Sequence, residues 1–176
     1  MSAQVAIACL DAAYDRTAAA VAGALIRSWD AECASQMLVR RFGGSSGSYE
    51  PGAFYKRELP LLLSIISDFD RPIEVIVIDG YVWLDANGLP GLGGHLFSSL
   101  ERRIPVVGIA KTRFRNDSWS ISVLRGESRR PLFITSAGIQ AREAAECVRR
   151  MHGDYRIPTI LNIVDRAARE GLAQHD

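Results

Sequence analysis

A continuous run of apolar residues near the middle of the chain places the strongest constraint on its fold. Residues 74–80, EVIVIDG, contain an unbroken β-branched stretch that ends at Asp79 and Gly80. Such a run is typical of a central strand that is buried on both faces of a sheet. Residues 105–110, PVVGIA, give another buried strand, which ends at Lys111. The sheet must therefore be covered on both faces.

The segments around these two runs predict an α/β fold. Residues 17–29, TAAAVAGALIRSW, are ambiguous, because alanine favours a helix whereas the alternation and the lead-out at Arg16 and Thr17 allow a strand. We expect the strand, in a hairpin with the strand before it. Further strands are predicted over 5–14, 36–42, 119–124 and 131–136. Helices are predicted over 52–68, with Pro60 early in that segment, over 92–103 and over 159–170. Residues 141–152 are predicted to form an amphipathic segment, and residues 43–48 a loop. Early strands followed by alternating helices and strands indicate a mixed sheet flanked by helices, a pattern that many α/β folds share.

Size, composition and charge narrow the class of protein. The chain of 176 residues fits a single domain over 1–176, and 48% hydrophobic with 23% charged residues is a globular balance. The N-terminus lacks the pattern of a signal peptide, and no apolar run approaches the roughly 20 residues that span a bilayer. Because Cys9, Cys33 and Cys147 are widely spaced, a reducing cytoplasm is expected. The net charge of +1 argues against nonspecific coating of nucleic acid, although arginine pairs at 40–41, 102–103, 129–130 and 149–150 are candidate local patches.

Two of the predicted strands lead into an acid. Asp11 follows VAIACL and Asp79 follows VIVI. In an open α/β sheet, ligands bind at the carboxyl ends of the strands. A buried carboxylate is unfavourable unless a charge offsets it, and Mg²⁺ or Mn²⁺ does so through oxygen ligands. Both acids are therefore candidate metal ligands, with turn capping or an arginine partner as the alternative.

Three other residues are ambiguous from pattern alone. Glu58 lies in the predicted helix 52–68, where a surface role is the simpler interpretation. Lys111 could bind a phosphate or an attacking water, or reach solvent. His95 is either a histidine on a helix face or a catalytic one.

A set of short motifs connects these residues. In chain order they are D-A-A-Y (11–14), S-Y-E-P-G-A-F-Y-K-R-E (48–58), V-I-D-G (77–80), G-L-G-G-H-L (91–96), G-I-A-K (108–111), P-L-F-I-T-S (131–136) and Y-R-I-P-T (155–159). In order and spacing the set resembles the endonuclease V family over nearly the whole chain, and the block that ends at Glu58 is its most specific element. The resemblance implies a ribonuclease-H-like fold and an enzyme that hydrolyses a phosphodiester bond in DNA or RNA containing a deaminated purine such as inosine.

The resemblance also implies roles for individual residues. Asp11, Glu58 and Asp79 are similar to the family's catalytic acids that bind Mg²⁺ or Mn²⁺, and Lys111 to a catalytic lysine near the phosphate. The residues implied to contact nucleic acid are Tyr14, Tyr49, Pro51, Gly52, Gly80 and His95, of which Tyr49, Pro51 and Gly52 resemble a wedge that fills the space left by a flipped base.

Departures from the family pattern concern substrate choice and turnover. Glu50 stands in the wedge where the family has an apolar residue, and the segment after Gly80 is lengthened. Ala137-Gly138-Ile139 replaces a Gly-His that is implied to lie by the metal-water site, which Asp85 or His95 would have to compensate. A metal-dependent endonuclease and a nucleic-acid-binding module without turnover are thus both open, beside a metal-dependent hydrolase of small phosphoesters.

Overall fold

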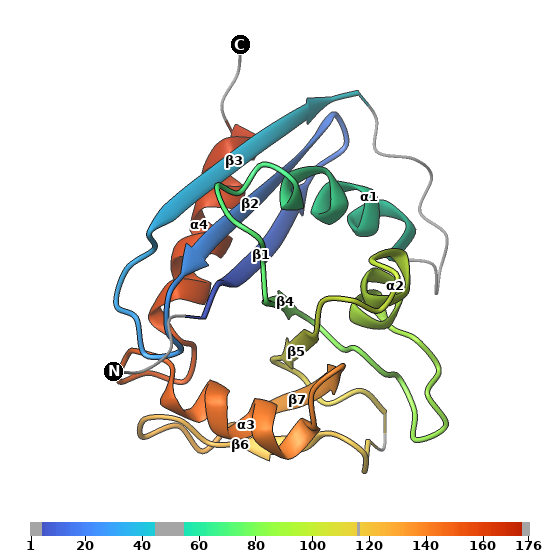
Figure 1. Ribbon diagram of the computed structural model, residues 1–176, viewed down its shortest axis with the longest axis vertical. Coiled ribbons are helices and arrows are strands. Elements are labelled where there is room, and N and C mark those ends of the chain that lie inside the picture. The colour runs from blue at the N-terminus through green and yellow to red at the C-terminus, as the bar shows by residue number, and fades with distance from the viewer. Residues whose placement is uncertain (1–4, 45–54, 116, 174–176) are drawn as a thin grey trace.

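A mixed β-sheet forms the centre of the molecule (Figure 1). Within residues 5–44, 55–115 and 117–173, which the computed structural model describes, seven strands pair in the order β3-β2-β1-β4-β5-β7-β6. They are β1 (Ile7–Tyr14), β2 (Ala18–Ile26), β3 (Gln36–Gly43), β4 (Val75–Asp79), β5 (Val106–Ala110), β6 (Ile121–Val123) and β7 (Leu132–Ala137).

Strand direction makes the sheet mixed. β1, β2 and β3 form antiparallel pairs, β4 lies parallel to β1 and β5 parallel to β4, and β7 and β6 continue antiparallel. This confirms the α/β class and the strand expected for the alanine-rich segment 17–29. All of β2 is buried, and its small side chains let other elements approach closely. A Cβ at Gly23, for example, would lie 2.8 Å from the ring of Phe69.

Helices cover both faces of the sheet. In the described part of the chain, α1 (Tyr55–Ile66) and α2 (Leu92–Ser99) lie on one face, and α3 (Ala141–Arg150) and α4 (Thr159–Ala173) on the other (Figure 1). Successive residues of a strand point to opposite faces, and the core divides accordingly. Cys9 belongs to the cluster that contains Val164 of α4, whereas Leu10 belongs to the cluster that contains Leu62 of α1.

The first strand, predicted over 5–14, reaches Tyr14, so Asp11 does not terminate it although the apolar run VAIACL leads into this acid. β1 continues to Tyr14, because β2 pairs with it as far as Ala19 opposite Tyr14. Only the parallel pairing of β1 with β4 stops before Asp11, at Leu10 opposite Ile78. Asp11 therefore lies where β1 leaves its parallel neighbour.

Three helices differ from their predicted bounds, and the smallest change is in α4, which continues to Ala173 and not only to residue 170. α2 ends at Ser99 and not at residue 103, because Glu101 and Arg102 take left-handed φ angles of 53° and 59°, which no α-helix continues. α1 is described from Tyr55 and contains Pro60 in its interior. The predicted start at residue 52 lies outside the described residues.

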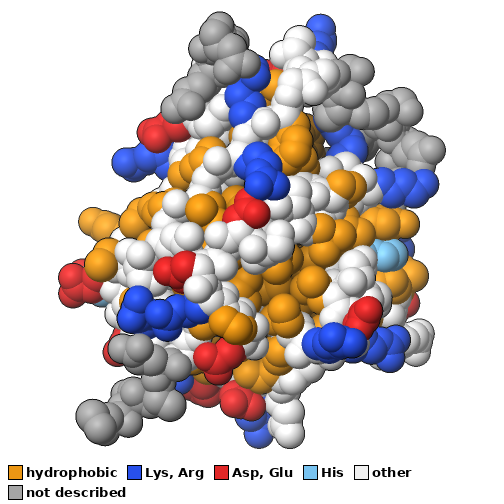
Figure 2. Space-filling model, turned by 45° about the horizontal axis from the view of Figure 1, so that its top comes forward, with side chains coloured by type: hydrophobic (Ala, Val, Ile, Leu, Met, Phe, Trp, Pro, Cys, Tyr) orange, Lys and Arg blue, Asp and Glu red, His pale blue; other side chains and the backbone are white. Residues whose placement is uncertain are grey.

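Charged side chains are interspersed over the surface. On the face shown in Figure 2, cationic and anionic side chains surround a central area of hydrophobic ones. Three of the predicted arginine patches contain an arginine paired with an acid, namely Arg40 with Asp68, Arg103 with Glu101 and Arg149 with Glu146. Exposed pairs of this kind contribute little to stability. No helix in the described part of the chain has the length and apolar character to cross a membrane.

Candidate active site

Three neighbouring strands bring two acids and a lysine to one end of the sheet. The β1–β4 register ends with Leu10 opposite Ile78, so Asp11 and Asp79 follow it on adjacent parallel strands. Lys111 directly follows β5, which pairs with β4 through Asp79. The three side chains share the face of the sheet that α4 covers, because residues two positions before each of them pack in the cluster of α4.

A narrow pocket lies where these side chains meet α4. Asp11, Asp79 and Lys111 form its polar side, and its space of about 20 Å³ holds roughly one water molecule. The apolar side is formed by Leu10, Ile109, Ile157, Leu161 and Val164. Charges beside such a wall are less well hydrated than on an open surface, so they interact more strongly with one another.

Lys111 is held by Asp79. Its Nζ donates a hydrogen bond to Oδ2 of Asp79 at 2.5 Å, and both side chains are partly exposed. Burial lowers the pKa of Lys111, but the bond to Asp79 and the nearby acids outweigh burial and raise that pKa above its ordinary value. Lys111 is therefore a firmly protonated cation at the strand ends.

Glu58 joins the two strand acids from the first turn of α1. Burial, followed by the charges of Asp11 and Asp79, raises the pKa of Glu58 to about 7. Burial, followed by the charge of Asp79, likewise raises the pKa of Asp11 to about 7. Two carboxyls shifted this far by burial and by neighbouring acids form a site that favours a positive charge.

Tyr14 and Arg57 border Glu58. A hydrogen bond from the Tyr14 side chain and the charge of Arg57 both act to lower the pKa of Glu58, against the larger effects that raise it. The Arg57 guanidinium carbon lies 4.1 Å from the centre of the Tyr14 ring, a cation–π contact. The structure thus brings Tyr14, predicted beside the metal, to the Glu58 carboxyl.

Asp165 is an acid of this site that the sequence did not reveal. It lies on α4 directly after Val164, and its charge raises the pKa values of both Asp11 and Lys111. Its own carboxylate pairs with Arg169 one turn along the helix. The available signal was helical spacing: Leu161, one turn before Asp165, lines the same pocket.

The family model of endonuclease V matches residues 2–129, well over half of the chain. The chain belongs to the endonuclease V family. The matched region contains Asp11, Glu58, Asp79 and Lys111, and ends before β7, α3 and α4. No curated protein matches the sequence.

Solved endonuclease V structures share the fold at low identity. The protein of Bacillus subtilis is 18% identical with a TM-score of 0.80, over 94% of this chain and 79% of that one. Human endonuclease V is 20% identical with a TM-score of 0.75, over 97% and 85%. Endonuclease V of Ciona intestinalis, solved with a 24mer DNA containing an inosine followed by a ribo-adenosine, is 14% identical with a TM-score of 0.75, over 98% and 87%. These likenesses confirm the ribonuclease-H-like fold.

The residues that the family resemblance assigns to nucleic acid lie in different situations. Tyr49, Glu50, Pro51 and Gly52 fall outside the described residues. Gly80 has φ +126°, a conformation that other residues rarely adopt, and a Cβ added there would meet nothing within 4 Å. A glycine is thus required beside Asp79 by the backbone itself.

Both proposed substitutes for the family histidine have partners of their own. Asp85 accepts hydrogen bonds from the backbone N–H groups of Asn87 and Leu89, both at 2.9 Å, and so closes its own loop. His95 stacks on the ring of Tyr55, with 3.6 Å between ring centres and 12° between planes, and burial lowers the pKa of His95. His95 therefore joins α2 to the start of α1.

In this fold the position after β7, where the family pattern has a histidine, is far from the acids. β7 runs antiparallel to β5, with Phe133 opposite Ala110 and Ala137 opposite Val106. Because Lys111 follows Ala110, residues after Ala137 lie at the opposite end of the sheet from the acids. A histidine there could not reach this site, so its absence leaves the acids unaffected.

The three carboxylates have the chemistry that a hard divalent cation needs. Three carboxylates supply the oxygen ligands that Mg²⁺ and Mn²⁺ favour, and a cation would relieve the effects that raise the pKa values of Asp11 and Glu58. As the side chains stand, no three acid, histidine or cysteine residues of the described ranges are arranged to hold one ion. Since Oδ2 of Asp79 accepts the bond from Lys111, an ion that uses this oxygen would displace Lys111.

Proposed function

We propose that this endonuclease V family member is a metal-dependent endonuclease that hydrolyses phosphodiester bonds in inosine-containing DNA or RNA. The observation that carries the proposal is the convergence of Asp11, Glu58 and Asp79, two of them with pKa values raised to about 7, beside the cation Lys111. Structural acids placed for stability alone would be expected to have cationic partners that lower their pKa values.

In the proposed mechanism Asp11, Glu58 and Asp79 would hold Mg²⁺ or Mn²⁺, which would supply activation of a water and stabilisation of the leaving oxygen. Lys111, released from Asp79, would place its ammonium at the phosphate and stabilise the charge that develops there. Tyr14 would hold the carboxylate of Glu58 in position through its hydrogen bond.

The substrate part of the proposal rests on the family. The Ciona intestinalis protein was solved with inosine-containing DNA, and it shares its fold with 98% of this chain. By resemblance, Tyr49, Pro51 and Gly52 would form the wedge, and Gly80 and His95 would border the nucleic acid. A flipped purine needs such a wedge, because extrusion of the base removes its stacking.

A nucleic-acid-binding module without turnover is the second candidate. The Lys111–Asp79 bond favours it, since a lysine in this place neutralises the acid without a metal. Glu50 in the wedge motif also favours altered recognition. A module of this kind would bind inosine-containing strands in the presence of EDTA.

A cleavage assay separates the two functions. Its substrates are labelled single- and double-stranded DNA and RNA, each with and without one inosine. With Mn²⁺ we expect cleavage only of the strands that contain inosine. EDTA and the substitution Asp79→Asn should each abolish this cleavage. Asp70→Asn is the matched control, because Asp70 is an exposed acid paired with Arg71 outside the pocket. Binding without cleavage, unchanged by Asp11→Ala, would instead support the module.

A further inference from the structure

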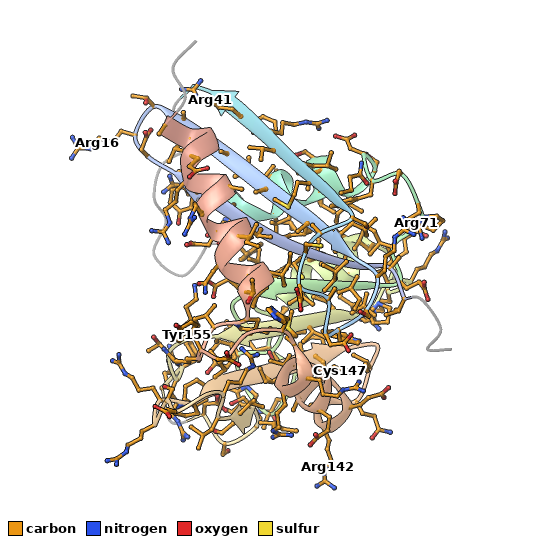
Figure 3. All side chains as sticks on the ribbon, turned by 90° about the vertical axis from the view of Figure 1, so that its left-hand side faces the viewer. Arg16, Arg41, Arg71, Arg142, Cys147 and Tyr155 are labelled. Atoms are coloured by element: carbon orange, nitrogen blue, oxygen red, sulfur yellow. The ribbon has the colours of Figure 1, made fainter. Side chains whose placement is uncertain are left out.

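An exposed aromatic ring lies on the loop that borders the carboxylate pocket. The side chain of Tyr155 is 79% exposed, more than any other large hydrophobic residue of the described ranges. Ile157, two residues further on, lines the pocket with Asp11 and Asp79. Two residues span at most roughly 7 Å of chain, so the backbone of Tyr155 lies within that distance of a residue that lines the pocket. Figure 3 shows Tyr155 at the surface near the end of α4 where that helix begins.

The backbone beneath Tyr155 is fixed by a buried arginine. Arg125 is 5% exposed, and its Nη1 donates to the carbonyl oxygens of Tyr155 at 2.9 Å and Arg156 at 3.4 Å. Its Nη2 donates to the carbonyl oxygens of Gly153 at 3.0 Å and of Met151. One guanidinium thus holds four carbonyls of the loop, and a ring on a fixed backbone loses less entropy when a ligand stacks on it.

The turn after β6 supports the same loop from below. Gly126 has φ +57°, and a Cβ added there would lie 2.1 Å from the carbonyl oxygen of Asp154 and 3.3 Å from Cα of Tyr155. Only a glycine permits this approach. The turn continues to Arg129 and Arg130, both exposed, which bring positive charge to the same region.

Arg156 links the loop directly to the lysine of the site. Its Nη2 donates to the carbonyl oxygen of Pro131 at 2.9 Å and to that of Lys111. The ring of Tyr155, the charges of Arg129 and Arg130, and the acid pocket are therefore parts of one braced surface. Exposed acids, Asp154 and Glu127, lie in the same two turns. An exposed aromatic ring with cations nearby can nevertheless bind single-stranded nucleic acid, the ring stacking on a base and the cations meeting phosphates.

We propose that Tyr155 is a stacking platform for a nucleobase next to the phosphate at the carboxylate site. This rests on the proposed function and adds a contact on the α4 side, made by residues beyond the wedge motif. Because every base has a flat face, the platform would be tolerant of sequence. It would position the strand and leave recognition of the inosine to other residues.

Two substitutions of Tyr155 separate a stacked ring from a merely apolar side chain. Tyr155→Phe keeps the ring, and Tyr155→Leu keeps apolar bulk without it. With a fluorescein-labelled single strand containing inosine, we expect fluorescence anisotropy in EDTA to give a wild-type Kd for the phenylalanine variant and a Kd about 5- to 100-fold higher for the leucine variant. In Mn²⁺ the leucine variant should raise KM by a similar factor with little change in kcat. Val39→Ala is the control, since Val39 is 49% exposed on β3 at the far edge of the sheet.

Strands that carry one abasic residue, moved stepwise from the inosine, locate the contacted base. When the abasic residue stands at one particular position of the strand, the Kd of Tyr155→Leu should equal that of wild type, because the base that stacks on Tyr155 is missing. Equal Kd and KM for the leucine variant and wild type on intact strands would overturn the platform while cleavage by wild type upholds the proposed function. Neither binding nor cleavage by wild type would overturn both.

Discussion

Replacing Asp11 by asparagine tests whether the site is electrostatically unfavourable without a cation. Burial and the charge of Asp79 raise the pKa of Asp11 from 3.8 to about 7. A carboxyl whose pKa is raised by folding binds its proton more tightly in the folded than in the unfolded chain. Its contribution to stability is therefore full at low pH and is lost as pH rises through about 7. Asparagine has a similar shape and no charge, so we expect Asp11→Asn to be more stable than wild type at pH 8 without metal.

The magnitude follows from the interval between pH 5 and pH 8. About two pH units of it lie below the raised pKa, and each unit corresponds to about 1.4 kcal/mol, an upper limit near 3 kcal/mol. Solvent screening, and titration shared with Glu58, reduce the expected gain to about 1–2 kcal/mol. In a chain of this length that is about 2–8 °C in Tm.

Thermal unfolding followed by circular dichroism in EDTA provides the assay. The Tm of Asp11→Asn minus that of wild type should grow by about 2–8 °C between pH 5 and pH 8. Mn²⁺ should then raise the Tm of wild type at pH 8 more than that of the variant, because a ligand stabilises the state that binds it. Asp70→Asn serves as control, because Asp70 is an exposed acid paired with Arg71 outside the pocket. A Tm difference that stays the same or shrinks between pH 5 and pH 8 would refute the reasoning.

Three further predictions concern the same site. Lys111→Met removes the ammonium from Asp79, so Mn²⁺ binding measured by electron paramagnetic resonance should tighten while cleavage slows about 10²- to 10³-fold; weaker Mn²⁺ binding would contradict competition between lysine and metal. Because Asp11 and Glu58 must lose their protons to bind a cation, Mn²⁺ affinity should rise from about pH 6 to about pH 8 and then level off, whereas a flat profile in calorimetric titration would speak against both as ligands. Asp165→Asn removes an acid that raises the pKa of Asp11, so carboxyl ¹³C titration by NMR should show that pKa lowered, and an unchanged value would place Asp165 outside the site.

Patterns along the chain were sufficient for the sheet and for Asp11 and Asp79 as candidate site acids, whereas Glu58 was assigned by the family resemblance. The unbroken apolar run before Asp79 predicted a central strand, and β4 is buried up to that acid. In the alanine-rich segment 17–29 the sequence supported both a helix and a strand. The segment forms the strand β2, which is buried between α1 and α4. Small side chains suit such a position whatever their helix propensity, because packing outweighs propensity.

Contacts between distant segments were beyond the reach of pattern. Asp165 looks like any polar residue of an amphipathic helix until α4 is laid against β1. Arg125 reads as a surface cation, yet it is buried under a loop some 30 residues away, as its bond to the carbonyl oxygen of Tyr155 shows. The sequence shows that the family histidine after Ser136 is missing, but not where that position lies. The antiparallel register of β7 places it at the end of the sheet opposite the acids.

A crystal soaked in Mn²⁺ and measured at the manganese absorption edge tests the metal site most directly. We predict an anomalous peak among the carboxylates of Asp11, Glu58 and Asp79, with Nζ of Lys111 withdrawn from its present 2.5 Å bond to Asp79. A crystal that binds Mn²⁺ elsewhere, or none while Lys111 stays on Asp79, would contradict a metal-dependent endonuclease built on these acids.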